Sequence, residues 1–218
     1  MPPSSPWTER IFFDAISRAE IRSLVYLPTG HERGDASWPM ILFLHGDGER
    51  GDDLALVKRE GLPRILEHNR DFRFVVVAPQ LRKGEKWSAQ LLDRLLDHAS
   101  GTYRVDPRRV YVTGLSSGAV ASLALAAFRP DRVAAAAAVS PNKTPGDGPC
   151  GAAAVWLFHN AYDERVPARV SRRLARALEA CGAEVRLTIF PKAGHDAWSD
   201  AYAQGDLYRW LLEHRTGG

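Results

Sequence analysis

Short apolar runs alternate with longer amphipathic segments along nearly the whole chain. The apolar runs are rich in Val, Ile, Leu and Phe, which is typical of strands buried in a sheet. The segments between them carry apolar residues at helical spacing. Strands that alternate with helices predict an α/β fold: a mostly parallel sheet covered by helices on both faces. The predicted strands are 21–27, 40–44, 74–78, 110–113, 154–158 and 185–190, and the predicted helices are 61–69, 88–99, 117–128, 168–181 and 199–213.

The alanine-rich run at residues 133–139 is ambiguous. Alanine is the strongest helix former, so the composition of this run favours a helix. The run is short, however, follows a predicted helix that ends near Arg129 and Pro130, and stops at Ser140 and Pro141. We therefore predict a central strand whose small side chains let a helix pack closely.

The size and composition of the chain fit one globular domain, expected over residues 1–218. Of the 218 residues, 45% are hydrophobic and 25% are charged, which excludes a disordered, collagen-like or coiled-coil chain. No apolar run approaches the ~20 residues that span a bilayer. Residues 1–10 lack the basic and apolar segments of a secretory signal. The sequence therefore predicts a cytoplasmic protein with no membrane partner.

The positive charge of the chain is a weak sign of nucleic-acid binding. The net charge is only +3, and the arginines are scattered. The densest group of arginines recurs at helical spacing, which is typical of a solvated helix face; it comprises Arg165, Arg169, Arg172, Arg173 and Arg176. We expect no nucleic-acid partner.

A candidate nucleophile lies at residues 114–118, which read Gly-Leu-Ser-Ser-Gly. This segment matches G-x-S-x-G, a motif that is informative only between a strand and a helix. Here a predicted strand precedes it and a helix-forming stretch follows. The two glycines permit a sharp turn that holds Ser116 in a strained backbone geometry and exposes its hydroxyl. The alternative is a glycine-rich turn with a capping serine.

A serine needs a base to react at neutral pH, and the base needs an acid to fix its tautomer. His195 follows the last predicted strand, and we expect it to be the base. Asp163 follows the strand at 154–158 and precedes a helix, and we expect it to orient His195. Two rivals remain for the acid. Glu164 lies one residue further into the turn, and Asp196 is adjacent to His195, a poor direction for pairing with its ring.

The glycine-rich loop at residues 44–51, Leu-His-Gly-Asp-Gly-Glu-Arg-Gly, follows a buried apolar strand. Its glycines let the backbone approach a substrate and direct N–H groups into the site. We predict an oxyanion hole made by the N–H of Asp47 and the N–H of Ser117. The alternative, a phosphate-binding turn, lacks the Lys-Ser/Thr ending and the glycine spacing of nucleotide loops.

With these residues in place, the chain resembles small serine esterases of the α/β-hydrolase superfamily, in which the catalytic residues follow the order Ser, Asp, His. It is similar to the phospholipase/carboxylesterase and "predicted peptidase" branch, which is related to polyhydroxybutyrate-depolymerase-like and feruloyl-esterase-like proteins. The resemblance covers most of residues 40–213 and is carried by segments 44–51, 78–80, 105–118, 194–198 and 207–212.

The chain departs from this branch at two positions. Asp47 stands where the branch usually has a small neutral residue, and an inward carboxylate would oppose the developing negative charge. We expect the Asp47 carboxylate to point away, with only its N–H used. Asn160 stands where the branch commonly has glycine, which leaves the turn before Asp163 less certain. Dienelactone hydrolases of the superfamily use a cysteine nucleophile, so Ser116 argues against that activity.

Three aromatic residues near the predicted carboxyl edge of the sheet are candidates for an acyl or alcohol pocket: Trp87, Tyr162 and Trp198. Ordinary packing is the alternative for each. The histidines outside the predicted triad form no ligand set, so we expect no metal and no cofactor.

The two cysteines, Cys150 and Cys181, show no metal-ligand spacing. Each precedes a predicted strand, and those two strands are expected to be neighbours in the sheet. This placement would allow the two cysteines to bond, but the predicted cytoplasmic compartment argues against a disulfide.

The resemblance and the residues together predict a serine carboxylic-ester hydrolase for short-chain or exposed acyl esters. A serine peptidase with the same residues and a non-catalytic binding protein on this fold are the alternatives. Residues 140–152 leave only a short connection where relatives often insert a lid domain, so we expect no lid and an open site. Acyl length, alcohol and oligomeric state are not readable from the sequence.

Overall fold

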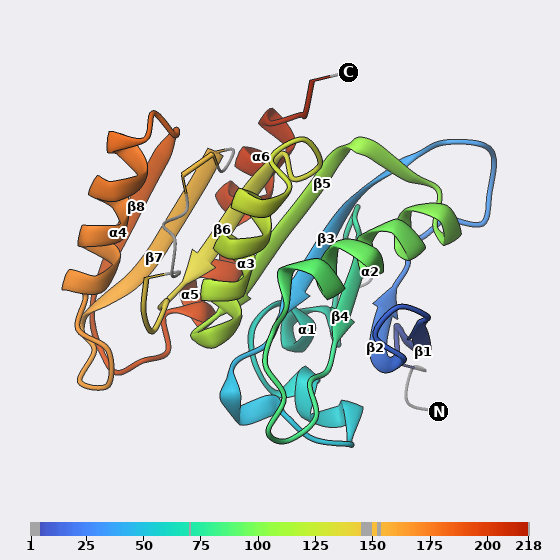
Figure 1. Ribbon diagram of the computed structural model, residues 1–218, viewed down its shortest axis with the longest axis horizontal. Helices are drawn as coiled ribbons and strands as arrows, with labels where there is room; N and C mark the ends of the chain where they lie inside the picture. The colour runs from blue at the N-terminus through green and yellow to red at the C-terminus, as the bar shows by residue number, and fades with distance from the viewer. Residues whose placement is uncertain (1–4, 70, 145–149, 152–153, 218) are drawn as a thin grey trace.

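The computed structural model describes residues 5–69, 71–144, 150–151 and 154–217. Its described strands form one sheet in the order β1-β2-β4-β3-β5-β6-β7-β8 (Figure 1). Strands β3 to β8 run parallel to one another, and β2 pairs antiparallel with β4 and with the edge strand β1. The prediction of a mostly parallel sheet is confirmed. The strands are β1 (Trp7–Asp14), β2 (Ala19–Tyr26), β3 (Trp38–Leu44), β4 (Val75–Pro79), β5 (Val105–Leu115), β6 (Ala135–Val139), β7 (Ala154–Tyr162) and β8 (Val185–Ala193).

Helices cover both faces of the sheet (Figure 1). Because successive strand residues point to opposite faces, Ile41 and Phe43 of β3 join one apolar core, whereas Met40, Leu42 and Leu44 join the other. The first core packs against η2 (Leu54–Arg59), α1 (Gly61–Leu66), α5 (Trp198–Ala203) and α6 (Gly205–Glu213), and the second against α2 (Ala89–Thr102), α3 (Ser117–Phe128) and α4 (Arg169–Ala180).

The alanine-rich run forms a central strand, as predicted. Strand β6 lies between β5 and β7, and its five residues are buried. Their side chains divide between the two cores: Ala135 and Ala137 face one core, and Ala136 and Ala138 face the other. Burial on both faces overrides the helix preference of alanine here.

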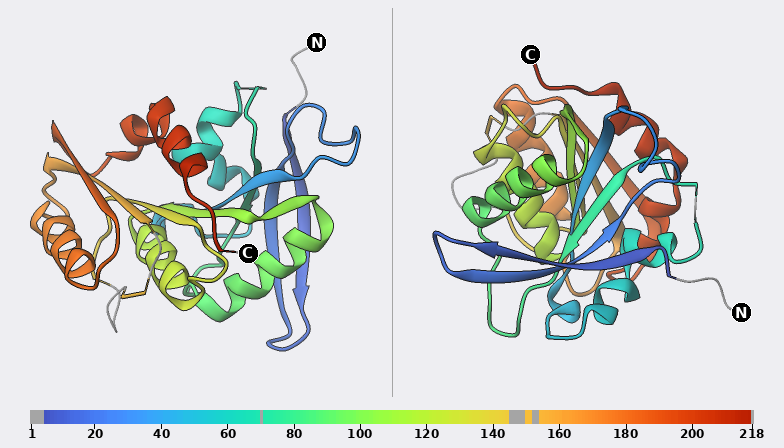
Figure 2. Two further views of the ribbon diagram at one scale, coloured as in Figure 1. Left: turned by 90° about the horizontal axis from the view of Figure 1, so that it is seen from above. Right: turned by 90° about the vertical axis from the view of Figure 1, so that its right-hand side faces the viewer.

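Two elements differ from the sequence prediction. Strand β1 was not predicted; it pairs with β2 at the sheet edge and extends with it from one end of the molecule (Figure 2). Its residues between Thr8 and Phe13 are mostly exposed on both faces, so it lacks the alternation that marks a half-buried strand. The single helix predicted at 199–213 is two helices, because Gln204 adopts an extended backbone between α5 and α6.

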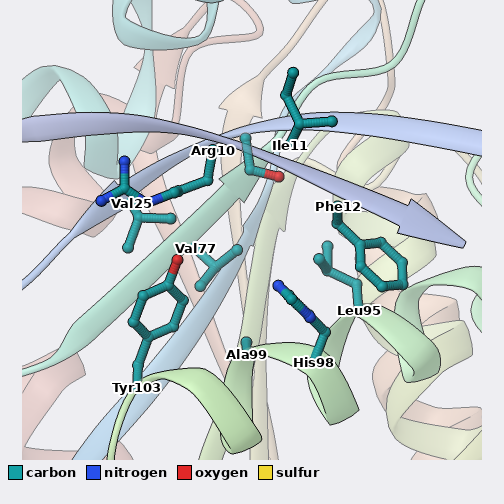
Figure 3. Close-up of a pocket in the computed structure, with 10 residues that line it drawn as sticks. Arg10, Ile11, Phe12, Val25, Val77, Leu95, His98, Ala99 and Tyr103 are labelled. Carbon is teal, nitrogen blue, oxygen red and sulfur yellow. The ribbon is translucent and has the colours of Figure 1, made fainter.

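A small cavity lies between the β1–β2 edge and α2 (Figure 3). It holds about 10 Å³, and Phe12, Leu95 and Tyr103 are among its lining residues. A space of that size admits about one water molecule. None of its lining residues is among the predicted site residues.

Cys150 and Cys181 form a disulfide, with their Cα atoms 5.4 Å apart. The prediction that the following strands β7 and β8 are neighbours is confirmed. Disulfides are typical of oxidising compartments, so this bond weighs against the cytoplasmic location, which stays a prediction. Among the described residues, no helix combines the length and the apolar character needed to cross a membrane.

Candidate active site

Ser116 lies at a sharp turn between β5 and α3. Its backbone has φ 53° and ψ −114°, a conformation that residues other than glycine rarely adopt. The flanking glycines make the turn possible. A Cβ on Gly114 would lie 2.5 Å from the backbone of Gly118, and a Cβ on Gly118 would overlap the carbonyl oxygen of Leu44. The turn leaves Ser116 partly exposed directly after the carboxyl end of β5.

The structure brings Ser116, His195 and Asp163 together from three separate loops. His195 Nε2 lies 3.1 Å from Ser116 Oγ, and His195 Nδ1 lies 2.6 Å from Asp163 Oδ2. Because the carboxylate only accepts hydrogen bonds, Nδ1 carries the proton and Nε2 is free to accept from the serine hydroxyl. The geometry matches the one that a serine nucleophile and its base require.

The Asp163 carboxylate is buried and held by several donors. Its Oδ1 accepts from the backbone N–H of Arg165 and of Val166, both at 2.9 Å. Burial alone would raise the pKa of Asp163, but the hydrogen bonds from His195 and from the backbone outweigh it and lower that pKa. Asp163 is therefore ionised at neutral pH and fixed in orientation.

The rival acids have other partners or positions. Asp196 accepts from the N–H and the hydroxyl of Ser199, at 2.9 and 2.7 Å, at the start of α5. Glu164 is exposed to solvent. The structure thus pairs Asp163, rather than either neighbour, with His195.

Two residues that the sequence reasoning did not assign to the site hold the His195 loop. The Asn160 side-chain amide lies 3.0 Å from the carbonyl oxygens of Gly194 and of Asp196. The Ser140 hydroxyl donates to the carbonyl oxygen of His195 at 3.0 Å. Asn160 entered the sequence analysis only as a departure from glycine. It is fully buried near the end of β7, and a polar residue at the end of a buried strand is the signal that could have assigned it to the site.

The loop after β3 lines the same cavity as Ser116. Gly46 N donates to the buried carboxyl group of Glu49 at 2.9 Å, which fixes the turn that carries Asp47. Asp47 begins η1 (Asp47–Glu49) and Ser117 begins α3, and the first N–H groups of a helix have no partner within it. The Asp47 carboxylate accepts from the Ser117 hydroxyl at 2.7 Å and pairs with Arg50 at 2.8 Å.

His45 supports this loop from behind. Leu81 N donates to His45 Nε2 at 3.0 Å, so Nδ1 carries the proton and donates to the Gly46 carbonyl at 2.6 Å. The Trp87 ring packs edge-on against the imidazole, and its Nε1 donates to the His45 carbonyl. Burial lowers the pKa of His45 to about 4, so this side chain is neutral at pH 7.

Two cavities meet at Asp47 and Asn142, which line both. The first, of about 370 Å³, contains Ser116 and His195 and is called the catalytic cavity below. The second, of about 580 Å³, lies beside Ser117 and Trp87 and is called the lateral cavity.

Two of the three predicted pocket residues line these cavities. Trp198 lines the catalytic cavity, packs edge-on against His195 and donates from Nε1 to Glu60 at 2.9 Å. Trp87 lines the lateral cavity. Tyr162 lines neither cavity and is 68% exposed at the end of β7. Across the described part of the chain, no cluster of three His, Cys, Asp or Glu side chains is arranged to hold a metal ion.

Comparison with known proteins adds a family to this geometry. Residues 15–200, which are most of the chain, match the family described as Esterase. The chain belongs to the Esterase family. This agrees with the esterase resemblance carried by the sequence motifs.

This Esterase-family chain is similar to one curated protein in sequence and to several solved structures in fold. Poly(3-hydroxyalkanoate) depolymerase C of Paucimonas lemoignei is 29% identical over 122 residues, which are 48% of this chain and 28% of the depolymerase. A thermostable esterase has a TM-score of 0.78 at 24% identity, over 96% of this chain and 63% of the other. A ferulic acid esterase has a TM-score of 0.71 at 16% identity, over 95% and 96%. The chain thus spans under a third of the depolymerase and under two thirds of the thermostable esterase. The structural matches confirm the α/β-hydrolase fold.

Proposed function

We propose that this Esterase-family chain is a serine carboxylic-ester hydrolase that acts on short-chain or exposed acyl esters. The observation that carries the proposal is the continuous line of contacts from Ser116 Oγ through His195 to Asp163, at 3.1 and 2.6 Å. Family membership supports the reaction class.

The reaction follows from the positions of these groups. Ser116 Oγ attacks the acyl carbon as its proton passes to His195 Nε2, and Asp163 stabilises the resulting imidazolium. The N–H groups of Asp47 and Ser117 hold the oxyanion, and each such donor is typically worth ~10²–10³ in rate. His195 then gives its proton to the departing alkoxide, which leaves an acyl-enzyme. Water, activated by His195, releases the acid and restores Ser116.

The strained turn contributes by holding the nucleophile in place. Ser116 N donates to the Val139 carbonyl at 2.9 Å, which anchors the turn to the end of β6. The serine hydroxyl is therefore oriented before substrate arrives. Such preorganisation lowers the entropy cost of reaching the transition state.

The test is a panel of p-nitrophenyl esters with acyl chains of two to eight carbons, measured beside matched peptide p-nitroanilides. We expect hydrolysis of the short esters by the wild type and a loss of at least ~10³-fold in kcat for Ser116→Ala. Undiminished ester hydrolysis by the variant would refute the mechanism. Cleavage of anilides without ester turnover would favour the peptidase alternative.

A further inference from the structure

The two cavities differ in the charge of their lining residues. Among the described lining residues, the lateral cavity carries three cationic side chains, Arg50, Lys86 and Lys143, against the carboxylate of Asp47. Arg50 pairs with Asp47 at 2.8 Å, so Lys86 and Lys143 leave this cavity positive.

The catalytic cavity has no such excess of positive charge. Its described lining residues include Asp47, Glu49 and Glu60 beside the single guanidinium of Arg165. Burial raises the pKa of Glu49, Asp47 pairs with Arg50, and Glu60 lies 3.7 Å from Arg64. An anionic group is therefore favoured in the lateral cavity over the catalytic cavity.

The chemistry fixes which half of an ester occupies each cavity. The departing alkoxide takes its proton from His195 Nε2, so the alcohol half lies in the catalytic cavity beside His195 and Trp198. The acyl half then extends past the N–H of Ser117 into the lateral cavity. That cavity is walled by the fixed Trp87 ring and by apolar side chains of α3, namely Val120, Ala121 and Ala124.

We propose that the preferred substrates are esters whose acyl group ends in an anion, such as half-esters of dicarboxylic acids. The proposal rests on the serine hydrolase function proposed above. The methylene chain of the acyl group packs against Trp87 and the small residues of α3, and its terminal carboxylate lies near Lys86 and Lys143. Surface charges of this kind act through the field of the cavity as well as through direct pairing.

The experiment compares isosteric esters that differ only in charge. Monoethyl adipate carries the anion on the acyl side, and ethyl 5-carbamoylpentanoate is its neutral isostere. On the alcohol side, 4-acetoxybutanoate and 4-acetoxybutanamide form the second pair. For the wild type at low salt, we expect kcat/KM to favour the acyl-side anion by about fivefold over its amide, and we expect no such preference for the alcohol-side anion. High salt should reduce the acyl-side difference.

Charge reversal tests whether Lys86 and Lys143 cause this preference. In Lys86→Glu/Lys143→Glu, the ratio of kcat/KM for monoethyl adipate to that for its amide should fall below one. Lys83→Glu reverses one charge in the loop that carries Lys86 but outside the cavity, and should keep the wild-type ratio. A ratio near one in the wild type, or equal ratios in all three proteins, overturns the substrate proposal while the amide ester is still hydrolysed. If the wild type hydrolyses none of these esters, or hydrolyses them no faster than Ser116→Ala, the hydrolase function is overturned as well.

A separate set of contacts lies behind Asp163. His159, at the end of β7, is fully buried, and its Nε2 lies 2.8 Å from the Val166 carbonyl and 3.2 Å from Asp163 Oδ2. Both of these oxygens only accept, so Nε2 carries the proton. The Ser171 hydroxyl in α4 donates to Nδ1 at 2.7 Å and completes this tautomer. Asp163 Oδ2 thus faces an N–H from His159 on one side and the N–H of His195 on the other.

The geometry points to His159 as a positioning residue that acts through Asp163. It shares the carboxylate oxygen that holds His195, so it sets both the orientation of that oxygen and the charge available to His195. Glutamine can place an N–H where His159 Nε2 stands, whereas phenylalanine fills the space without a donor.

The test measures kcat, KM and the pH profile for His159→Phe and His159→Gln, with thermal melts of both. We expect about a tenfold loss of kcat for Phe with little change in KM, the cost of one hydrogen bond to a charged group, and partial recovery for Gln. The acid limb of the kcat/KM profile should move to higher pH in Phe, because the carboxylate then attracts a proton on His195 more strongly. Equal kcat in the two variants, or an unmoved acid limb, would show a purely structural role and overturn the inference.

Discussion

Replacing His45 with glutamine should remove much of the acid sensitivity of folding. Burial lowers the pKa of His45 to about 4, compared with about 6.5 in an unfolded chain. The folded protein therefore resists protonation at a position that the unfolded chain protonates readily. The stability that arises from this pKa difference of His45 is fully present above pH 6.5 and is lost as the pH falls toward 4.

The size of the loss follows from the two pKa values. Between pH 7 and pH 5, this one group should reduce the free energy of unfolding by about 2 kcal/mol, and by about 3 kcal/mol at pH 4. His45→Gln should be less stable than the wild type at pH 7, because the bond from Nδ1 to the Gly46 carbonyl is lost. It should then lose about 2 kcal/mol less than the wild type on acidification to pH 5.

Urea unfolding at several pH values between 7 and 4 provides the measurement, with the difference between wild type and variant plotted against pH. The same series at high salt serves as a control: the shift comes mainly from burial, so salt should leave the difference in place. Parallel pH curves for the two proteins would refute the reasoning, because they would show that His45 protonates equally in the folded and unfolded states.

Two further predictions concern the scaffold. Gly118→Ala should abolish soluble, folded protein in an expression and circular-dichroism test, because a Cβ would overlap the Leu44 carbonyl oxygen; a folded, active variant would contradict the packing at the turn. Cys150→Ser/Cys181→Ser should lower the free energy of unfolding by about 3 to 4 kcal/mol, since the disulfide closes a loop across 31 residues. Thiol titration of the denatured, unreduced wild type should find no free cysteine, and two free thiols would show that the bond does not form.

The sequence indicated the turn at Ser116 because the information there is local. Gly114 and Gly118 are needed where the backbones of β5, α3 and β3 meet, so the motif and the packing coincide. The order of Ser116, Asp163 and His195 along the chain likewise follows strand ends, which a parallel sheet gathers at one edge. The positions of these three residues were predictable because each follows the end of a strand in the parallel sheet.

Contacts between distant loops could not be predicted in the same way. The amide of Asn160 in β7 donates to the loop that follows β8 and carries His195. The hydroxyl of Ser140, after β6, donates to the same loop. A single polar residue after a strand has many possible partners, and only the three-dimensional structure selects one. The division of the site into two cavities of different charge also depends on side-chain placement. Strand β1 was missed because an edge strand is exposed on both faces and has no apolar period.

The most direct test of the proposed mechanism is covalent labelling with a fluorophosphonate, followed by peptide mass spectrometry. The account predicts stoichiometric labelling of Ser116, labelling slowed by orders of magnitude in Asp163→Asn, and none at this position in Ser116→Ala. Ester hydrolysis should decline in step with labelling of the wild type. Full ester turnover by protein labelled completely at Ser116, or labelling confined to another residue, would contradict the account.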